Sequence, residues 1–342
     1  MDSITQVALG SAVGYAALGS KLGRKALLVG AAFGTLPDLD VLIDFGGAVE
    51  NFVFHRSFSH SLLIQLMLSP LFAWLLLRFQ WSKPVSLMRW SVALFAIMST
   101  HALLDAFTVY GTQLLWPLTD YPFGVSSIFI IDPAYSVPLL CAVIALAFIK
   151  SPATGQRLNI AVLTLSCGYL AWSVAAKWYI DDKIKAAMTA QNMTYLAYES
   201  TPSAFNTLLW RAVATTPSGH YEIYASIFDN PEEVSIAFYP TENTLLDKLS
   251  NERRVRLLQQ FTKGLYGIYL ENNQLIFSDL RMGVEGFYVF SFVIAKQSQQ
   301  TLEFADFKQL ERRPPLSRAS KLFERITDPS IKLNFQSDIQ PD

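Results

Sequence analysis

Three of the four histidines lie with several aspartates in one stretch of otherwise apolar chain, between residues 37 and 132. Imidazoles and carboxylates are costly to bury in apolar surroundings unless they pair with one another or bind a metal ion. The stretch therefore raises the hypothesis that these side chains converge on one cation. The polar residues concerned are Asp38, Asp40, His55, His60, His101, Asp105 and Asp132.

The fourth apolar segment contains the motif His101-Ala-Leu-Leu-Asp105. Residues four apart share one face of a helix, so the imidazole and the carboxylate can reach the same ion, or the carboxylate can orient the imidazole. On its own, such a pair is typical of a hydrogen bond that packs two helices together. Here further histidines and aspartates accompany it, and this favours a metal site.

Two more motifs supply those further residues. Pro37-Asp38-Leu39-Asp40 is predicted to end an apolar helix, because proline cannot continue one. His55-Arg56-Ser57-Phe58-Ser59-His60 places two imidazoles five residues apart, with Ser59 predicted to cap a helix that starts near Ser61. Taken alone, the first motif is a common turn and the second an interfacial loop with basic side chains.

A mixed set of imidazoles and carboxylates indicates which metal would bind. Hard ions such as calcium prefer oxygen ligands alone, whereas imidazole suits transition metals. The predicted cofactor is therefore a divalent metal, with zinc preferred and manganese or iron as alternatives. The candidate metal ligands are Asp38, Asp40, His55, His60, His101 and Asp105.

Arg56 lies between two of the candidate ligands. Its guanidinium can clamp a phosphate or carboxylate of a substrate, and the alternative is a contact with lipid headgroups. Residues 111–112 are predicted to form a turn over the site, with Thr108 and Tyr110 as hydrogen-bond donors. His220 stands beside a turn in the polar half of the chain and is predicted to be a surface residue. No nucleotide-binding or hydrolase fingerprint and no basic, aromatic-rich patch is present, so no nucleic-acid partner is expected.

The composition indicates a membrane protein. Of the 342 residues, 51% are hydrophobic and only 16% are charged, which is too apolar for an ordinary soluble enzyme. Residues 1–180 are lightly charged, whereas residues 181–342 carry most of the charges. Both cysteines fall in apolar runs without a CxxC motif, which argues against a disulfide framework.

The membrane half contains about six apolar segments that are predicted to be helices, several of them close to the ~17–25 residues that cross a bilayer. Lysines and arginines gather in the connectors after the first, third and fifth segments, and such connectors favour the cytoplasmic side. The site then lies at the extracytoplasmic face of a multi-pass bacterial-type inner membrane protein, in contact with the lipid bilayer. The segments are residues 4–19, 26–43, 61–77, 90–104, 133–149 and 158–176.

The polar half is predicted to be a soluble, extracytoplasmic α+β domain rich in antiparallel strands, over residues 181–310. A hairpin is expected at 207–216 and 220–228, around Pro217-Ser218-Gly219, and a helix at 245–261. Residues 311–342 are predicted to be a polar, loosely ordered tail. Further strands are expected at 233–239, 265–270, 274–278 and 287–295.

The motifs resemble those of the YdjM/YbcI-type family, whose members are regarded as membrane-bound metal-dependent hydrolases. The resemblance covers about residues 1–180 and rests on PDLD at 37–40, FHRSFSHS at 54–61, HALLDAFTVYGTQLLWP at 101–117 and Asp132-Pro133. Many members open with a Thr-His pair in the first helix, where this chain has Thr5-Gln6. Glutamine is a poor ligand for a transition metal, so one ligand of the family's site is replaced here.

That family in turn is similar to helical zinc-dependent phospholipases C and single-strand nucleases. The resemblance implies an enzyme in which metal-activated water hydrolyses a phosphoester of a lipid or envelope molecule. It implies His60, His101, Asp105 and either Asp38 or Asp40 as ligands. Asp132 would be a ligand or the general base, and Arg56 would clamp the substrate.

The alternative is a non-catalytic membrane protein with a structural metal and a soluble domain that binds a partner. A structural site is fully coordinated, whereas a catalytic one keeps a position for water. Both hypotheses require one site, so the ligand atoms of His60, His101, Asp105 and one of Asp38 and Asp40 should approach to within roughly 5 Å.

Overall fold

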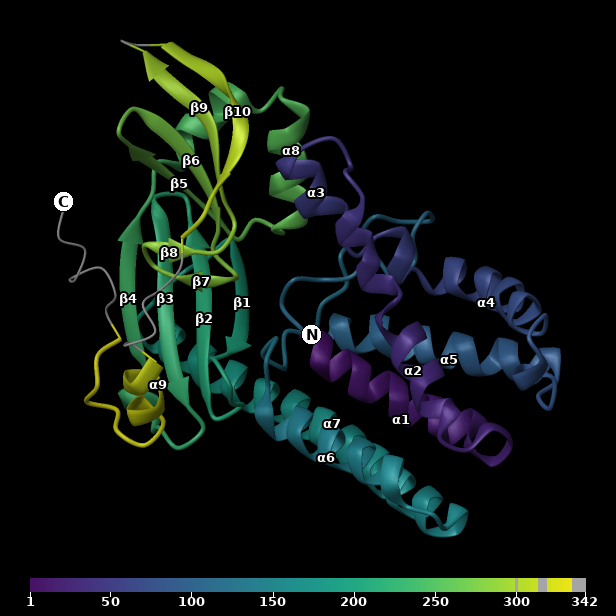
Figure 1. Ribbon diagram of the computed structural model, residues 1–342. Helices are drawn as coiled ribbons and strands as arrows, with labels where there is room; N and C mark the ends of the chain where they lie inside the picture. The colour runs from purple at the N-terminus through teal and green to yellow at the C-terminus, as the bar shows by residue number, and fades with distance from the viewer. Residues whose placement is uncertain (299–300, 313–318, 334–342) are drawn as a thin grey trace. The chain divides into compact units, whose positions relative to one another are not determined.

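The computed structural model describes residues 1–298, 301–312 and 319–333, and the chain divides into two compact units. The first unit comprises Met1–Ile43 and His55–Val174, and the second comprises Asp44–Phe54 and Ala175–Asp342. Each of the six predicted apolar segments contains a helix (Figure 1), which confirms the helical membrane region. These helices are α1 (Ser3–Leu22), α2 (Lys25–Thr35), α4 (Leu62–Leu76), α5 (Leu87–Ala106), α6 (Pro133–Phe148) and α7 (Pro152–Ala190).

Polar side chains begin most of these helices. Ser86 caps α5, and Asp132 caps α6 ahead of Pro133, so each satisfies backbone N–H groups that have no partner within the helix. At α4 the predicted cap was wrong. Ser61, not Ser59, accepts from the backbone of Ile64, because the Ser59 hydroxyl is bound to Asp40 instead.

Glycines bring α1 and α2 into close contact. A Cβ atom built on Gly30 would lie 2.1 Å from the carbonyl oxygen of Gly10, and one on Gly10 would lie 2.4 Å from that of Gly30. Only glycine permits backbones to approach this closely. α2 ends at Thr35, and the chain continues as a short 3-10 helix, η1 (Pro37–Leu42), and as α3 (Ala48–Phe54).

Among the residues that the structure describes, two helices, α5 and α7, are long and apolar enough to cross a membrane. A third span results if Ala48–His60 and Leu62–Leu76 form one broken span. α2 and α6 are apolar but shorter. α7 continues well beyond the predicted end at residue 176. Its last turns bury Ile180, Ile184 and Met188 in the core of the second unit, and this packing stabilises the longer helix.

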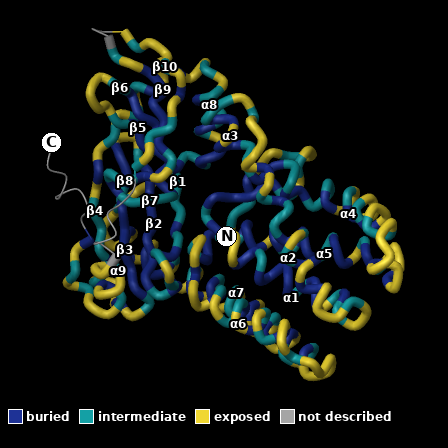
Figure 2. Tube along the Cα trace, viewed as in Figure 1, coloured by how far each residue is buried: buried dark blue, intermediate teal, exposed yellow. Residues whose placement is uncertain are grey.

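The described part of the second unit contains two four-stranded antiparallel sheets, with strand orders β1-β2-β3-β4 and β10-β9-β6-β5, and a small β7-β8 pair. The predicted antiparallel α+β domain and its first hairpin are confirmed. In Figure 2 the middle strands β2 and β3 are mostly buried. The strands are β1 (Ala197–Pro202), β2 (Leu209–Thr216), β3 (Gly219–Ser226), β4 (Ser235–Pro240), β5 (Tyr266–Glu271), β6 (Gln274–Asp279), β7 (Gly283–Val284), β8 (Phe287–Tyr288), β9 (Ser291–Ser298) and β10 (Thr301–Leu310).

Three predicted elements differ from the structure. The helix expected at 245–261 is a 3-10 helix, η5 (Asn243–Leu249), followed by α8 (Arg253–Phe261), because Glu252 caps a new helix. The strand expected at 287–295 is divided between β8 and β9. Within the predicted tail, α9 (Ala319–Arg325) holds a buried Arg325 that pairs with Asp229 at 2.7 Å. Residues 313–318 and 334–342 of that tail lie outside the described residues.

Candidate metal centre

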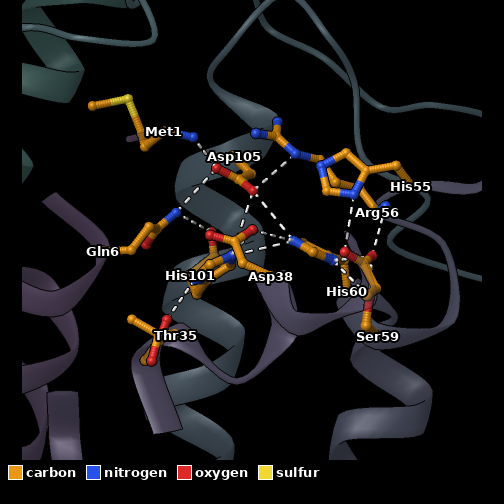
Figure 3. A network of polar contacts seen from close by, with 12 residues as sticks. Met1, Gln6, Thr35, Asp38, His55, Arg56, Ser59, His60, His101 and Asp105 are labelled. Atoms are coloured by element: carbon orange, nitrogen blue, oxygen red, sulfur yellow. Dashed lines mark hydrogen bonds and ion pairs between the residues drawn. The ribbon is translucent and has the colours of Figure 1, made fainter. Parts of the chain in front are cut away.

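Three elements of the first unit bring four potential ligands together. Asp38 comes from η1, His60 from a second 3-10 turn, η2 (Phe58–His60), and His101 and Asp105 from successive turns of α5. One potential ligand atom from each residue lies within 4.8 Å of the other three, and the side chains point toward one another (Figure 3). We call these residues the four-residue group.

The spacing of these atoms fits one tetrahedral ion. The two Nε2 atoms of His60 and His101 are 3.2 Å apart. Asp38 Oδ1 lies 3.6 Å from His60 Nε2 and 3.3 Å from His101 Nε2, and for Asp105 Oδ2 the same distances are 3.3 and 3.5 Å. Ligands at about 2.0–2.2 Å from a tetrahedral zinc ion are separated by about 3.3–3.6 Å. Direct hydrogen bonds between charged groups are shorter, at about 2.7–2.9 Å.

Hydrogen bonds on the far side of each ring fix which nitrogen faces the group. His101 Nδ1 lies 2.6 Å from the carbonyl oxygen of Gly34 and must donate to it. Ser59 Oγ donates to Asp40 Oδ2 at 2.7 Å, so it accepts from His60 Nδ1 at 2.9 Å. Each ring, when neutral, therefore presents an unprotonated Nε2 to the centre, as metal-binding histidines do.

Asp105 supplies a buried oxygen to the same point. Its Oδ2 accepts no hydrogen bond from any described residue, although Arg56 Nε lies 3.1 Å away. Its Oδ1 accepts from Gln6 Nε2 at 3.0 Å and contacts the N-terminal amine of Met1. Gln6 therefore orients Asp105 from behind. The two lone pairs of the imidazoles and this carboxylate oxygen are the donor set that a zinc ion requires.

Asp38 is the member of the group nearest to solvent, with 24% of its side chain exposed, whereas His60 and Asp105 are fully buried. Burial opposes ionisation of Asp38, but the neighbouring imidazoles of His101 and His60 hold the pKa of this carboxyl well below its usual value. Asp38 is therefore ionised and ready to bind a cation. Of the two aspartates that the sequence left open, the structure places Asp38 in the group.

Asp40 and His55 lie beside the group and not in it. Asp40 Oδ2 accepts from Ser59 and from the backbone N–H of Arg56 at 2.9 Å, and Asp40 Oδ1 lies 2.9 Å from His55 Nδ1. Burial opposes ionisation of Asp40, yet contacts with His55 and His60 hold its pKa well below the usual value. Asp40 thus supports His60 through Ser59.

Arg56 is buried next to Asp105, with its guanidinium 5.1 Å from the centre of the Tyr110 ring. Its Nη1 donates to Thr108 Oγ1 at 3.3 Å, so Thr108 is an acceptor here. Arg56 has a positive φ of 65°, a conformation that costs roughly 1–3 kcal/mol in a residue other than glycine and that clusters at functional sites. Gly111, at φ 95°, turns the chain that follows.

Asp132 is not part of the four-residue group. Its Oδ1 accepts from the backbone N–H groups of Ala134 and Tyr135 at the start of α6, and its Oδ2 accepts from the Tyr169 hydroxyl at 2.8 Å. Burial raises the pKa of this carboxyl despite those hydrogen bonds. The structure therefore does not bring Asp132 to the candidate ligands.

Two partners of the histidines carried little signal in the sequence. The Gly34 carbonyl belongs to the backbone, which any residue would offer, so no pattern could mark it. Ser59 stood inside a motif, but its role depends on Asp40, nineteen positions earlier. Such contacts become visible only when the fold is known.

Comparisons with known proteins agree with the resemblance in the motifs. A model of the YdjM family, described as YdjM inner membrane protein, matches residues 1–180. Inner membrane protein YbcI of Escherichia coli (strain K12) is 35% identical over 124 residues, which cover 35% of this chain and 69% of YbcI. No solved structure matches the chain. With more than half of its length matched, including the whole four-residue group, the chain belongs to the YdjM family of inner membrane proteins.

Proposed function

We propose that the first unit is a metal-dependent hydrolase of phosphoesters, with zinc as the preferred ion and manganese or iron as alternatives. The observation that carries this proposal is the pair of Nε2 atoms, 3.2 Å apart, with both Nδ1 atoms committed to acceptors. Two lone pairs this close repel each other unless a cation or a proton lies between them. Asp38 and Asp105 add two anionic oxygens at metal-ligand spacing.

The residues around the group suit a phosphate. His60, His101, Asp105 and Asp38 would hold the ion, which when bound supplies Lewis acidity and lowers the pKa of a contacting water toward about 7. Arg56 keeps a positive charge beside them, with Nε near Asp105 and Nη1 on Thr108. We therefore assign Nη2 of Arg56 to a phosphate oxygen. Asp132 receives no catalytic part, because one of its oxygens caps α6 and the other accepts from the Tyr169 hydroxyl of α7.

The substrate class follows from the surface beside Asp38. On η1 the neighbouring side chains Leu39, Val41 and Leu42 are exposed, with fractions of 53, 72 and 80%. A run of exposed apolar side chains next to a site marks contact with membrane or with an apolar ligand. We infer an amphiphilic phosphoester, a lipid or a lipid-linked envelope molecule, that reaches the group from the bilayer. We infer from the charge of the connectors that this face lies on the extracytoplasmic side of the inner membrane.

A structural metal site is the second candidate, and a specific observation favours it. Four protein ligands already complete a tetrahedron, whereas catalytic zinc sites commonly use three and keep one position for water. Gln6 stands where many members have histidine, so this chain lacks one side chain that could enlarge the site. Under this reading the ion would join η1, η2 and α5 and no substrate would be turned over.

One experiment separates the two candidates. The full-length protein is purified in detergent, its bound metal is measured by mass spectrometry, and phosphomonoesters, phosphodiesters and phospholipids are tested with and without a chelator. The hydrolase predicts chelator-sensitive turnover that falls at least 100-fold in His101→Ala and is unchanged in Asp120→Ala, a substitution on an exposed loop. Metal bound to the wild type without turnover on the whole panel supports the structural site instead.

A further inference from the structure

A second cluster of buried titratable side chains lies in the second unit. Side chains on β3 alternate between the two faces of the sheet: Ile223 and Ala225 pack in the core that includes the end of α7, whereas His220 and Glu222 point to the opposite face. The prediction that His220 is a surface residue was wrong, since its exposed fraction is 0%. The residues next to His220 in the sequence gave no sign that its side chain is buried.

Glu285, in the turn between β7 and β8, faces these β3 residues. One ligand atom each of His220, Glu222 and Glu285 lies within 4.8 Å of the other two, and His220 Nε2 is 3.3 Å from Glu285 Oε2. The Tyr288 hydroxyl sits among them, 3.1 Å from His220 Nε2, 3.1 Å from Glu222 Oε1 and 2.9 Å from Glu285 Oε2. We call these four residues the β3 cluster.

The cluster carries an excess negative charge in a place closed to water. Two carboxylates are balanced by one guanidinium, that of Arg211, which contacts Glu222 Oε1. Glu222 Oε2 is buried and has no hydrogen-bond partner among the described residues, and Glu222 and Glu285 are 2 and 3% exposed. An unbalanced buried charge is costly, so the cluster requires one more positive charge.

We propose that the β3 cluster is a second metal site, in which His220, Glu222 and Glu285 bind a divalent transition ion, zinc by preference. One imidazole and two carboxylates are ligands that zinc accepts, and the Tyr288 hydroxyl is placed to hold or complete the set. Because solvent is excluded, the ion has a structural role. It joins β3 to the β7-β8 pair, which contains only short strands.

The test counts metal in a chain that lacks the first site. His101→Ala removes a ligand of the four-residue group, and the full-length variant in detergent is stripped with chelator, given Zn²⁺, and analysed by mass spectrometry. The proposal predicts about one ion per chain in His101→Ala and none in His101→Ala/Glu285→Gln. Adding Zn²⁺ should raise the melting temperature of the first variant and leave that of the second unchanged. Because the first site is disabled throughout, the result does not depend on whether the proposed hydrolase exists.

A matched control guards against general destabilisation. Glu50, on α3, is also a buried carboxylate of the second unit and pairs with Arg254 at 3.0 Å. His101→Ala/Glu50→Gln should therefore keep its one ion. An unchanged circular dichroism spectrum shows that His101→Ala is folded. If this folded variant binds no Zn²⁺, the proposal is overturned, and a proton on His220 supplies the missing charge.

Discussion

At the scale of single residues, the candidate centre depends on which atom receives the hydrogen bond that the Ser59 hydroxyl donates. Ser59 has a single proton and gives it to Asp40, so its oxygen must accept from His60. In the neutral ring, this leaves Nε2 of His60 without a proton on the side that faces His101. Supporting contacts of this kind fix the tautomer and raise the basicity of a ligand, and their loss commonly lowers metal affinity 10–100-fold.

We therefore expect Ser59→Ala to weaken zinc binding at the four-residue group by about 10–100-fold without unfolding the protein. Competition with a chromophoric chelator measures the affinity, in a Glu285→Gln background that disables the β3 cluster. Ser91→Ala is the control, because its hydroxyl donates to the backbone carbonyl of Leu87 within α5. An affinity equal to that of the control would mean that Ser59 does not set the His60 tautomer.

Tyr198 gives the second unit a predicted sensitivity to alkali. Burial, followed by the charge of Asp181, raises the pKa of this phenol well above its ordinary value of 10.0, and the hydroxyl donates to Asp181 at 2.8 Å. The unfolded chain releases this proton near pH 10 and the folded chain keeps it. Stability is therefore full below pH 10 and falls as pH rises, by up to about 1.4 kcal/mol per pH unit.

Thermal melting of wild type and Tyr198→Phe between pH 8 and 11.5 checks this expectation. The variant should be less stable near pH 8, because the hydrogen bond to Asp181 is lost, and its melting temperature should fall less steeply above pH 10. Other tyrosines ionise in both proteins and cancel in the difference. Parallel curves for the two proteins would show that Tyr198 titrates normally.

Residue patterns predicted part of the candidate centre and could not predict the rest. The i, i+4 spacing of His101 and Asp105 was enough to place both on one face of a helix. The choice between Asp38 and Asp40 was not, because it depends on how the 3-10 turn after Pro37 is wound. Asp132 was grouped with the others by its polarity and by the family resemblance, although its oxygens cap α6 and bind Tyr169.

At the scale of elements, apolar runs predicted the helices, whereas capping residues and tertiary packing determined where the helices end. The 245–261 segment has one apolar face throughout, yet Glu252 caps a new helix and interrupts it. α7 continues beyond its apolar run because its final turns pack on a sheet. The residues of the helix do not reveal where that sheet lies. Alternation predicted the first hairpin well, since Pro217-Ser218-Gly219 marks its turn.

The α1–α2 contact should tolerate no side chain at Gly30. Alanine there would place Cβ against the Gly10 backbone, and such overpacking costs about 1–3 kcal/mol or more. The helices would move apart and shift Gly34, which anchors His101. We therefore expect Gly30→Ala to lower both the melting temperature and the zinc content.

Gly168 is the matched control for that substitution. It lies inside α7, and a Cβ atom built on it would meet no described atom within 4 Å, so Gly168→Ala should be neutral or stabilising by up to about 1 kcal/mol. The comparison separates close packing from the general preference of helices for alanine. Equal melting temperatures for the two variants would remove the close-packing explanation.

At the scale of the whole molecule, the length and flanking charges of α7 predict which side of the membrane each of its ends occupies. A helix of 39 residues is about 58 Å long at 1.5 Å per residue, longer than the ~30 Å hydrocarbon core. Lys150 and Arg157 stand at its first end, and such residues favour the cytoplasm. The second unit begins within α7, at Ala175, and long domains translocate largely regardless of their own charge.

Labelling of single cysteines tests this orientation. In a chain with Cys141→Ser and Cys167→Ser, Ser250→Cys in the second unit and Ser151→Cys before α7 both introduce an exposed thiol. A membrane-impermeant maleimide should label Ser250→Cys in intact spheroplasts, and Ser151→Cys only after the membrane is opened. The reverse pattern would place the second unit in the cytoplasm. Labelling of both cysteines in intact spheroplasts would mean that α7 does not cross the membrane. The charge of the connectors would then not predict the side on which the site lies.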